Sequence, residues 1–213
     1  MTNSSQKTLS YIYAVIVVLV IVSITKRITT PSNYDIIITN GEVIDGSGSS
    51  SVYKDVGIIG NKIHKIGNLS SAESERYIDA EGLVVSPGFI DVHVHLDPIL
   101  RLSNSESHVR QGVTTSLGGP DGTSPWPFGE FLDTLSQVGV GMNVAYLVGH
   151  NTVRRNVMGL ENRAPSEEEL NEMEHQISTG MDEGAYGIST GLKYLPGSFS
   201  EVEEVIALSK KAS

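Results

Sequence analysis

The feature that most constrains the fold is the run Phe89–Asp97, in which apolar and polar residues alternate from Ile90 onward. Such alternation is typical of a β-strand with one buried face, and residues two apart in a strand lie on the same face. His93 and His95 are therefore expected to lie side by side, with Asp91 one step earlier. Two imidazoles at this spacing can bind one divalent ion. The run predicts either two ligands of a metal site or, alternatively, a pair of surface histidines on an edge strand.

Cysteine is absent from the 213 residues, which excludes disulfides, thiolate metal sites, iron–sulfur clusters and cysteine nucleophiles. Any metal must therefore be held by histidine, by carboxylate or by an oxygen derived from lysine. The chain has 25 acidic and 15 basic residues and a net charge of −10. A nucleic-acid-binding surface needs an excess of basic side chains. We expect a small-molecule substrate and no nucleic-acid partner.

An uncharged hydrophobic segment lies near the N-terminus. The run Tyr11–Ile24 contains no charge and no helix breaker, and Lys26 and Arg27 follow it. With its neighbours it covers residues 9–25, about 17 residues, which is short for a membrane-spanning helix and also suits a secretory signal. We expect residues 1–30 to be an N-terminal hydrophobic helix with a linker, acting as a membrane anchor or a cleaved signal. The protein would then be membrane-anchored or secreted or periplasmic, with its orientation undecided.

Residues 31–88 are rich in strand and turn signals. Asn40-Gly41 and Gly60-Asn61 each separate two short apolar runs, a pattern typical of β-hairpins. Further short strands are expected on both sides of Glu81-Gly82. We therefore expect residues 31–88 to form a small antiparallel β-sandwich segment, which Ser86-Pro87-Gly88 ends before the histidine run.

The run S-P-G-F-I-D-V-H-V-H, together with the earlier Y-D-I-I-I-T-N-G-E-V-I-D-G and D-V-G-I-I-G-N-K-I-H-K-I-G, resembles the metal-dependent amidohydrolase superfamily. The resemblance extends from Tyr34 to about Ser209. It implies a β-sandwich beside a (β/α)8 barrel, with the His-x-His pair at the end of the first barrel strand. Two later motifs are similar to the D-aminoacylase branch, the N-acyl-D-amino-acid deacylases. They are G-H-x-T-x-R at residues 149–154 and G-x-S-T-G-L-x-Y-x-P-G at residues 187–197.

The resemblance also implies the next barrel strands, at Arg110–Thr115, Asn143–Gly149 and Ala185–Tyr194, and the acidic run after Pro165 predicts a helix over Ser166–Met181. A complete barrel needs about 250 residues. The 125 residues from Phe89 to Ser213 provide four strand–helix units. The expected fold is therefore α/β, with residues 89–213 as the N-terminal half of a TIM-like (β/α)8 barrel from a longer protein. Two further metal-binding histidines and the general acid/base aspartate would lie beyond residue 213.

The expected cofactor is Zn²⁺, as one or two ions, held by His93 and His95 with two further candidates. Where many members of the branch carry G-N-C-G with a zinc-binding cysteine, this chain has Gly119-Pro120-Asp121-Gly122. Asp121 is expected either to bind the metal or to form only a turn. Lys193 stands where hydantoinase-like relatives place a carbamylated lysine between two metals, and the alternative is an ordinary solvated lysine.

Two residues are candidates for the substrate pocket, because barrel active sites are built at the carboxyl ends of the strands. They are His150 and Tyr194. The predicted function is hydrolysis of the amide bond of N-acyl-D-amino acids or D-dipeptides by a metal-activated water. One alternative is a hydrolase of cyclic amides, like hydantoinases or dihydroorotases. Another is a non-catalytic, membrane-attached fragment, and residues 1–213 alone are expected to be inactive.

Overall fold

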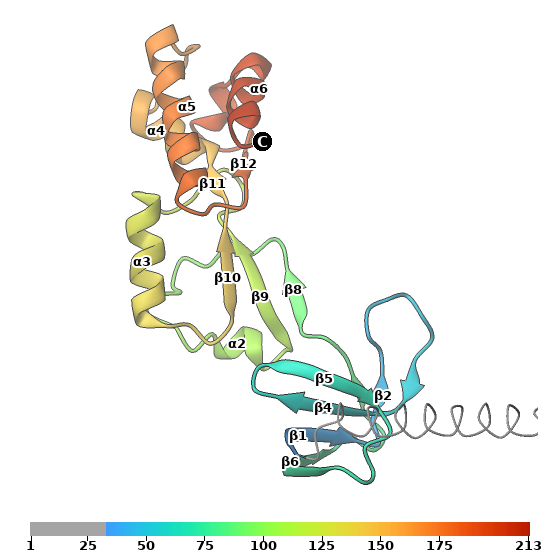
Figure 1. Cartoon of the computed structure of the whole chain (residues 1–213). Coiled ribbons are helices and arrows are strands. Elements are labelled where there is room, and N and C mark those ends of the chain that lie inside the picture. The colour runs from blue at the N-terminus through green and yellow to red at the C-terminus, as the bar shows by residue number, and fades with distance from the viewer. Residues whose placement is uncertain (1–32) are drawn as a thin grey trace, which may run out of the picture. The chain divides into compact units, whose positions relative to one another are not determined.

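The computed structural model of the chain describes residues 33–213, so the predicted hydrophobic helix within residues 1–30 lies outside the described residues (Figure 1). Among the residues that the structure describes, no helix is both long and apolar enough to cross a membrane. The chain divides into two compact units between Pro87 and Gly88. Each unit has its own sheets and its own buried core.

The first unit contains two small sheets. The larger has the order β5-β4-β1-β6, and the smaller has the order β3-β2-β7. Their strands are β1 (Asn33–Thr39), β2 (Glu42–Val43), β3 (Val52–Tyr53), β4 (Asp55–Ile59), β5 (Lys62–Gly67), β6 (Glu73–Asp79) and β7 (Val84–Val85). The pairs β1–β6 and β2–β7 are parallel, so the prediction of a purely antiparallel sheet was wrong. The core of this unit is built on Tyr34, Ile37 and Leu69.

The two predicted hairpins have different outcomes. The hairpin at Gly60-Asn61 is confirmed, because β4 and β5 pair in antiparallel fashion and Gly60 has a φ of 59°. The hairpin at Asn40-Gly41 was wrong, since β1 pairs with β4 and β6 whereas β2 pairs with β3 and β7. The chain changes sheets at this point. Gly41 is needed there because a Cβ would lie 2.5 Å from Cγ2 of Val85.

The second unit alternates parallel strands with helices. Three strands pair in the order β10-β9-β8, and β11 pairs with β12. The strands are β8 (Phe89–Asp91), β9 (Val113–Gly118), β10 (Asn143–Tyr146), β11 (Val148–Gly149) and β12 (Ile188–Ser189). The helices are α2 (Glu106–Val109), α3 (Phe128–Val138), α4 (His150–Met158), α5 (Glu167–Asp182), the 3₁₀ helix η1 (Gly197–Phe199) and α6 (Val202–Lys211). This succession confirms the α/β fold class.

The predicted third strand is divided in two. The Leu147 N–H donates to the carbonyl of Gly118, and the next residue, Val148, donates to the carbonyl of Gly187. The chain therefore pairs with β9 up to Tyr146 and with β12 from Val148. The predicted fourth strand is also shorter than expected, because β12 contains only two residues and a loop follows it.

Helix α5 begins as its sequence predicts. The Ser166 hydroxyl accepts a hydrogen bond from the Glu169 N–H, and the Glu169 carboxylate accepts one from the Ser166 N–H. This capping box satisfies two N–H groups that have no partner inside the helix. Arg163 forms an ion pair with the same carboxylate. Hydrogen bonds from Arg163 and Ser166 lower the pKa of Glu169 to about 2.

The capping box predicts a measurable stability loss for Ser166→Ala. Loss of an N-cap side chain costs about 1 kcal/mol of unfolding free energy, and urea denaturation measures it. The matched control is Ser209→Ala, which makes the same chemical change at an exposed position of α6. That control should leave the unfolding free energy unchanged or slightly higher, because alanine favours helix. Equal losses in the two variants would contradict a capping role.

Candidate metal centre

The histidine pair follows the first parallel strand. Strand β8 ends at Asp91, whose Oδ1 accepts a hydrogen bond of 3.1 Å from the His93 N–H. This bond turns the chain, so His93 and His95 lie in a loop, and the prediction of a strand through Asp97 was wrong. The rings nevertheless lie close together, with centroids 6.1 Å apart. The two imidazoles are juxtaposed by a turn and not by strand alternation.

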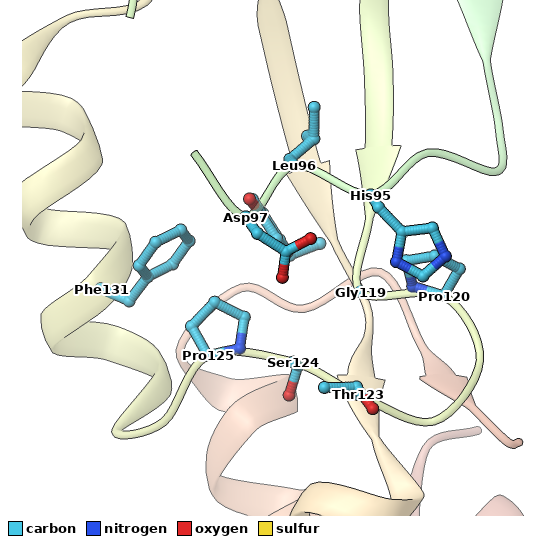
Figure 2. Close-up of a pocket in the computed structure, with 10 residues that line it drawn as sticks. His95, Leu96, Asp97, Gly119, Pro120, Thr123, Ser124, Pro125 and Phe131 are labelled. Carbon is cyan, nitrogen blue, oxygen red and sulfur yellow. The ribbon is translucent and has the colours of Figure 1, made fainter. Parts of the chain in front are cut away.

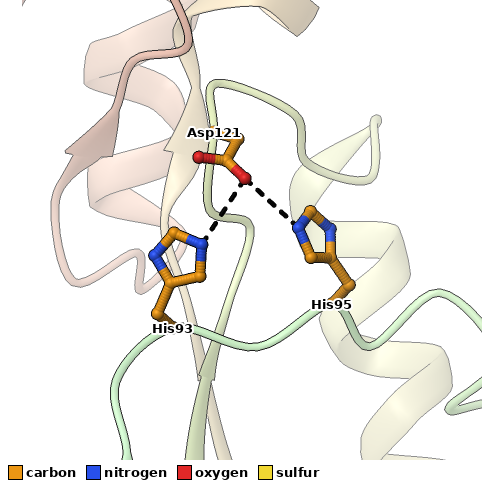
Figure 3. A group of neighbouring side chains, drawn as sticks. All are labelled: His93, His95 and Asp121. Atoms are coloured by element: carbon orange, nitrogen blue, oxygen red, sulfur yellow. Dashed lines mark hydrogen bonds and ion pairs between the residues drawn. The ribbon is translucent and has the colours of Figure 1, made fainter.

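Asp121 lies between the two histidines. Its Oδ2 is 3.5 Å from Nε2 of His93 and 3.2 Å from Nε2 of His95 (Figure 3). Asp121 comes from the turn after β9 and has a φ of 57°, in the left-handed region. Gly119 and Gly122, on either side of it, have φ values of 75° and 77°. Asp121 therefore lies in a turn and also presents its carboxylate to the histidines, and its role as a metal ligand stays a prediction.

The three side chains form a donor set that suits a divalent ion. Their ligand atoms all lie within 4.8 Å of one another. Ligands bound tetrahedrally to zinc at about 2.0–2.1 Å are about 3.3 Å apart, close to the observed nitrogen–oxygen distances. Imidazole nitrogen and carboxylate oxygen are both ordinary zinc ligands. The histidine side chains are 63% and 58% exposed and that of Asp121 is 32% exposed, so a substrate can approach this cluster.

Lys193 and Tyr194 lie on the loop after β12, and both are exposed. This loop packs against the Asp121 turn, because a Cβ at Gly191 would lie 1.9 Å from the Asp121 carbonyl oxygen. The Tyr194 N–H donates to the carbonyl of Gly191. The loop that carries Lys193 and Tyr194 therefore lies against the turn that carries Asp121. Their metal-binding and substrate-binding roles remain predictions.

His150 has a different setting from the one expected. Its side chain has no solvent exposure, and its Nε2 lies 2.8 Å from Oε1 of Glu204. Arg154 forms an ion pair with the same carboxylate, and the Ser200 hydroxyl donates a hydrogen bond to it. A ring buried in this way offers no surface to a substrate. We therefore correct the prediction for His150: it joins helix α4 to helix α6.

A cavity of about 340 Å³ lies beside His95 (Figure 2). Its apolar walls include Leu96, Pro125 and Phe131, and its polar groups include Asp97 and Ser124. Tyr146, at the carboxyl end of β10, also lines it. Burial, together with the nearby charge of Asp97, raises the pKa of Tyr146 to about 12, so the phenol keeps its proton.

Sequence reasoning did not assign Asp97, Ser124 or Tyr146 to a site. The signal that could have identified Ser124 and Tyr146 was their position along the chain, at or after the end of a strand. Tyr146 is the last residue of β10, and Ser124 lies in the connection after β9. Polar groups at the carboxyl ends of parallel strands are candidates for binding residues. The sequence placed the end of the third strand at Gly149, three residues after Tyr146, so Tyr146 was not recognised as a strand-end residue.

The second unit is an α/β fold in which parallel strands alternate with helices. A cluster of two histidines and one carboxylate follows its first two strands, an arrangement found in metal-dependent hydrolases. The profile of the amidohydrolase family matches residues 76–208, more than half of the chain. The chain belongs to the amidohydrolase family.

Several known proteins are similar to this chain. The D-aminoacylase of Alcaligenes xylosoxydans xylosoxydans is 35% identical over 204 residues, covering 84% of this chain and 42% of the relative. A D-aminoacylase structure with a binuclear metal centre is 34% identical, with a TM-score of 0.79, over 84% of this chain and 43% of that one. The N-acyl-D-glutamate deacylase of Bordetella bronchiseptica, complexed with zinc and a phosphonate inhibitor, is 31% identical with a TM-score of 0.80 and the same coverage. The chain thus spans less than half the length of these relatives.

Proposed function

We propose that this chain is part of a metal-dependent hydrolase that cleaves the amide bond of N-acyl-D-amino acids. The observation that carries the proposal is the convergence of His93, His95 and Asp121 on one point. The relatives named D-aminoacylase and N-acyl-D-glutamate deacylase support the substrate class, because they match most of this chain. The binuclear metal centre of the D-aminoacylase structure and the zinc bound to the N-acyl-D-glutamate deacylase support a site for one or two zinc ions.

The residues of this chain would hold the ion and orient the substrate. His93 and His95 would bind through neutral ring nitrogens, and Asp121 would add one negative charge. A divalent ion bound there supplies a more acidic water and a polarised amide carbonyl. These three residues would share the site with the further histidine ligands that the resemblance implies. Lys193, if its amine takes up CO₂ to form a carbamate, is our candidate for a further metal ligand, and Tyr194 is our candidate for a substrate contact.

The cavity beside His95 suits the acyl group of such a substrate. Leu96, Pro125 and Phe131 offer it apolar surface, and burial of that surface favours binding. The Asp97 carboxylate lines the same cavity and would repel the carboxylate of an amino acid. The charged end of the substrate would therefore lie outside this cavity. The products would be the acyl carboxylate and the free amino acid, with a proton of the attacking water passing to the leaving amine.

The alternative of a cyclic-amide hydrolase is tested by substrate choice. The L-hydantoinase of Arthrobacter aurescens is 24% identical with a TM-score of 0.56, a likeness that shows the fold alone. We expect the full-length, zinc-loaded protein to hydrolyse N-acetyl-D-amino acids and to leave hydantoins and N-acetyl-L-amino acids uncut, as followed by amine release and chromatography. Hydantoin cleavage without deacylation would support the alternative. Zinc binding without either activity would support the non-catalytic interpretation.

A further inference from the structure

The Asp121 turn is closed by a hydroxyl from a distant strand. The Ser189 hydroxyl, on β12, accepts a hydrogen bond of 3.0 Å from the Gly122 N–H and donates one to the Gly119 carbonyl. Gly119 and Gly122 are the two ends of the four-residue turn that contains Asp121. Ser189 is about 70 residues away in the sequence, so this contact exists only in the folded chain.

A second residue holds the continuation of the same turn. The Thr152 N–H, on α4, donates to the Gly122 carbonyl over 3.1 Å. Its hydroxyl accepts from the Ser124 N–H over 2.9 Å and donates to the Ser124 carbonyl over 3.1 Å. The Ser124 hydroxyl in turn accepts from the N–H of Gly149, the residue before α4. The segment from Gly119 to Ser124 is thus fixed to β12 at one end and to α4 at the other.

This segment needs external support. Asp121 has a φ of 57°, and a non-glycine residue in the left-handed region carries a conformational cost that its surroundings must offset. Gly191 provides a further contact to this segment, because its backbone packs directly against the Asp121 carbonyl. The carboxylate is useful as a ligand only if it stays within about 0.5 Å of its place.

We propose that Ser189 and Thr152 are positioning residues that hold the Asp121 carboxylate in line with His93 and His95. The proposal rests on the proposed function, since it concerns the same donor set. Thr152 belongs to the sequence motif at residues 149–154, and Ser189 belongs to the motif at residues 187–197. Neither motif contributes a residue to the donor set of His93, His95 and Asp121. The hydroxyls of Ser189 and Thr152 are bonded to the backbone of the Asp121 turn, so each residue would act on the donor set through that turn.

The test measures Co²⁺ binding by the full-length protein with hydroxyl deletions and their conservative counterparts. Ser189→Ala and Thr152→Val remove the hydroxyls, whereas Ser189→Thr and Thr152→Ser keep them. The two hydroxyl deletions should raise the dissociation constant for Co²⁺ by about 10- to 100-fold, as is usual when a residue that orients a metal ligand is removed. They should also alter the visible absorption bands of the bound ion. The conservative variants should restore affinity and spectrum. If Ser189→Ala does not fold, Thr152→Val decides the question.

The matched control is Ser116→Ala on β9, a buried hydroxyl whose hydrogen bond goes to the sulfur of Met142. It should leave Co²⁺ affinity and spectrum unchanged whatever it does to stability. Deletion variants with normal affinity and spectrum but a lower urea midpoint would overturn the positioning role and leave the metal site intact. Unchanged Co²⁺ binding by His93→Ala would instead overturn the proposed function. The two failures are therefore distinguishable.

Discussion

His93→Ala should abolish most of the proposed amidohydrolase activity of the full-length protein. The substitution leaves one imidazole and one carboxylate of the three-donor cluster. Removal of groups that merely orient a metal ligand costs about 10- to 100-fold in metal affinity or activity, so loss of a ligand itself should lower kcat/KM by more than about 100-fold. Steady-state kinetics at saturating zinc, combined with elemental analysis of the purified variant, measures both effects.

The control for this prediction is His175→Ala, which removes an exposed histidine on α5. It should retain the activity and metal content of the unmodified protein. If His93→Ala were as active as His175→Ala, the histidine pair would be two surface side chains without a chemical role.

Glu204→Gln should lower the unfolding free energy by about 3–5 kcal/mol, because it leaves a buried arginine without a counter-charge. The Glu204 side chain is 2% exposed; it shares a hydrogen bond with His150 and forms an ion pair with Arg154, and neither partner has any exposure. Glu203→Gln, at an exposed position next to it, is the matched control and should change the free energy by about 0.5 kcal/mol or less. Urea denaturation of both variants measures the difference.

The pH dependence of this effect has a definite sign. Burial alone would raise the pKa of Glu204, but hydrogen bonds from His150, Arg154 and Ser200 and the charge of Arg154 outweigh it, so the pKa is lowered. The stabilisation from the Glu204 carboxylate is therefore fully present at pH values above the pKa of Glu204 in the unfolded chain. It is lost as the pH falls through the lower pKa that Glu204 has in the folded protein. The deficit of Glu204→Gln should shrink on acidification. A deficit that grows at acid pH would contradict this account of the buried carboxylate.

Local features of the fold were predictable from the sequence because their causes are local. The Ser166–Glu169 capping box and the Gly60-Asn61 turn each depend on a few neighbouring residues, and the structure contains both. The same reasoning failed at Asn40-Gly41. There the pairing of β1 with β6 and of β2 with β7 is decided by segments 30 or more residues away.

The site was predictable in composition more than in geometry. The H-x-H spacing identified two neighbouring imidazoles, although a turn after Asp91 and not a strand places them together. The setting of His150 could not be foreseen, since its partner Glu204 lies 54 residues away. The residues that support the Asp121 turn are also far away in sequence, since Ser189 lies 67 residues from Gly122 and Thr152 lies 28 residues from Ser124.

The most direct test is anomalous X-ray diffraction from crystals of the full-length protein grown with zinc, with data collected on both sides of the zinc absorption edge. We expect an anomalous peak about 2.0–2.2 Å from Nε2 of His93, from Nε2 of His95 and from a carboxylate oxygen of Asp121. Absence of zinc from this position in a metal-loaded, active enzyme, or zinc held only by other residues, would contradict the account.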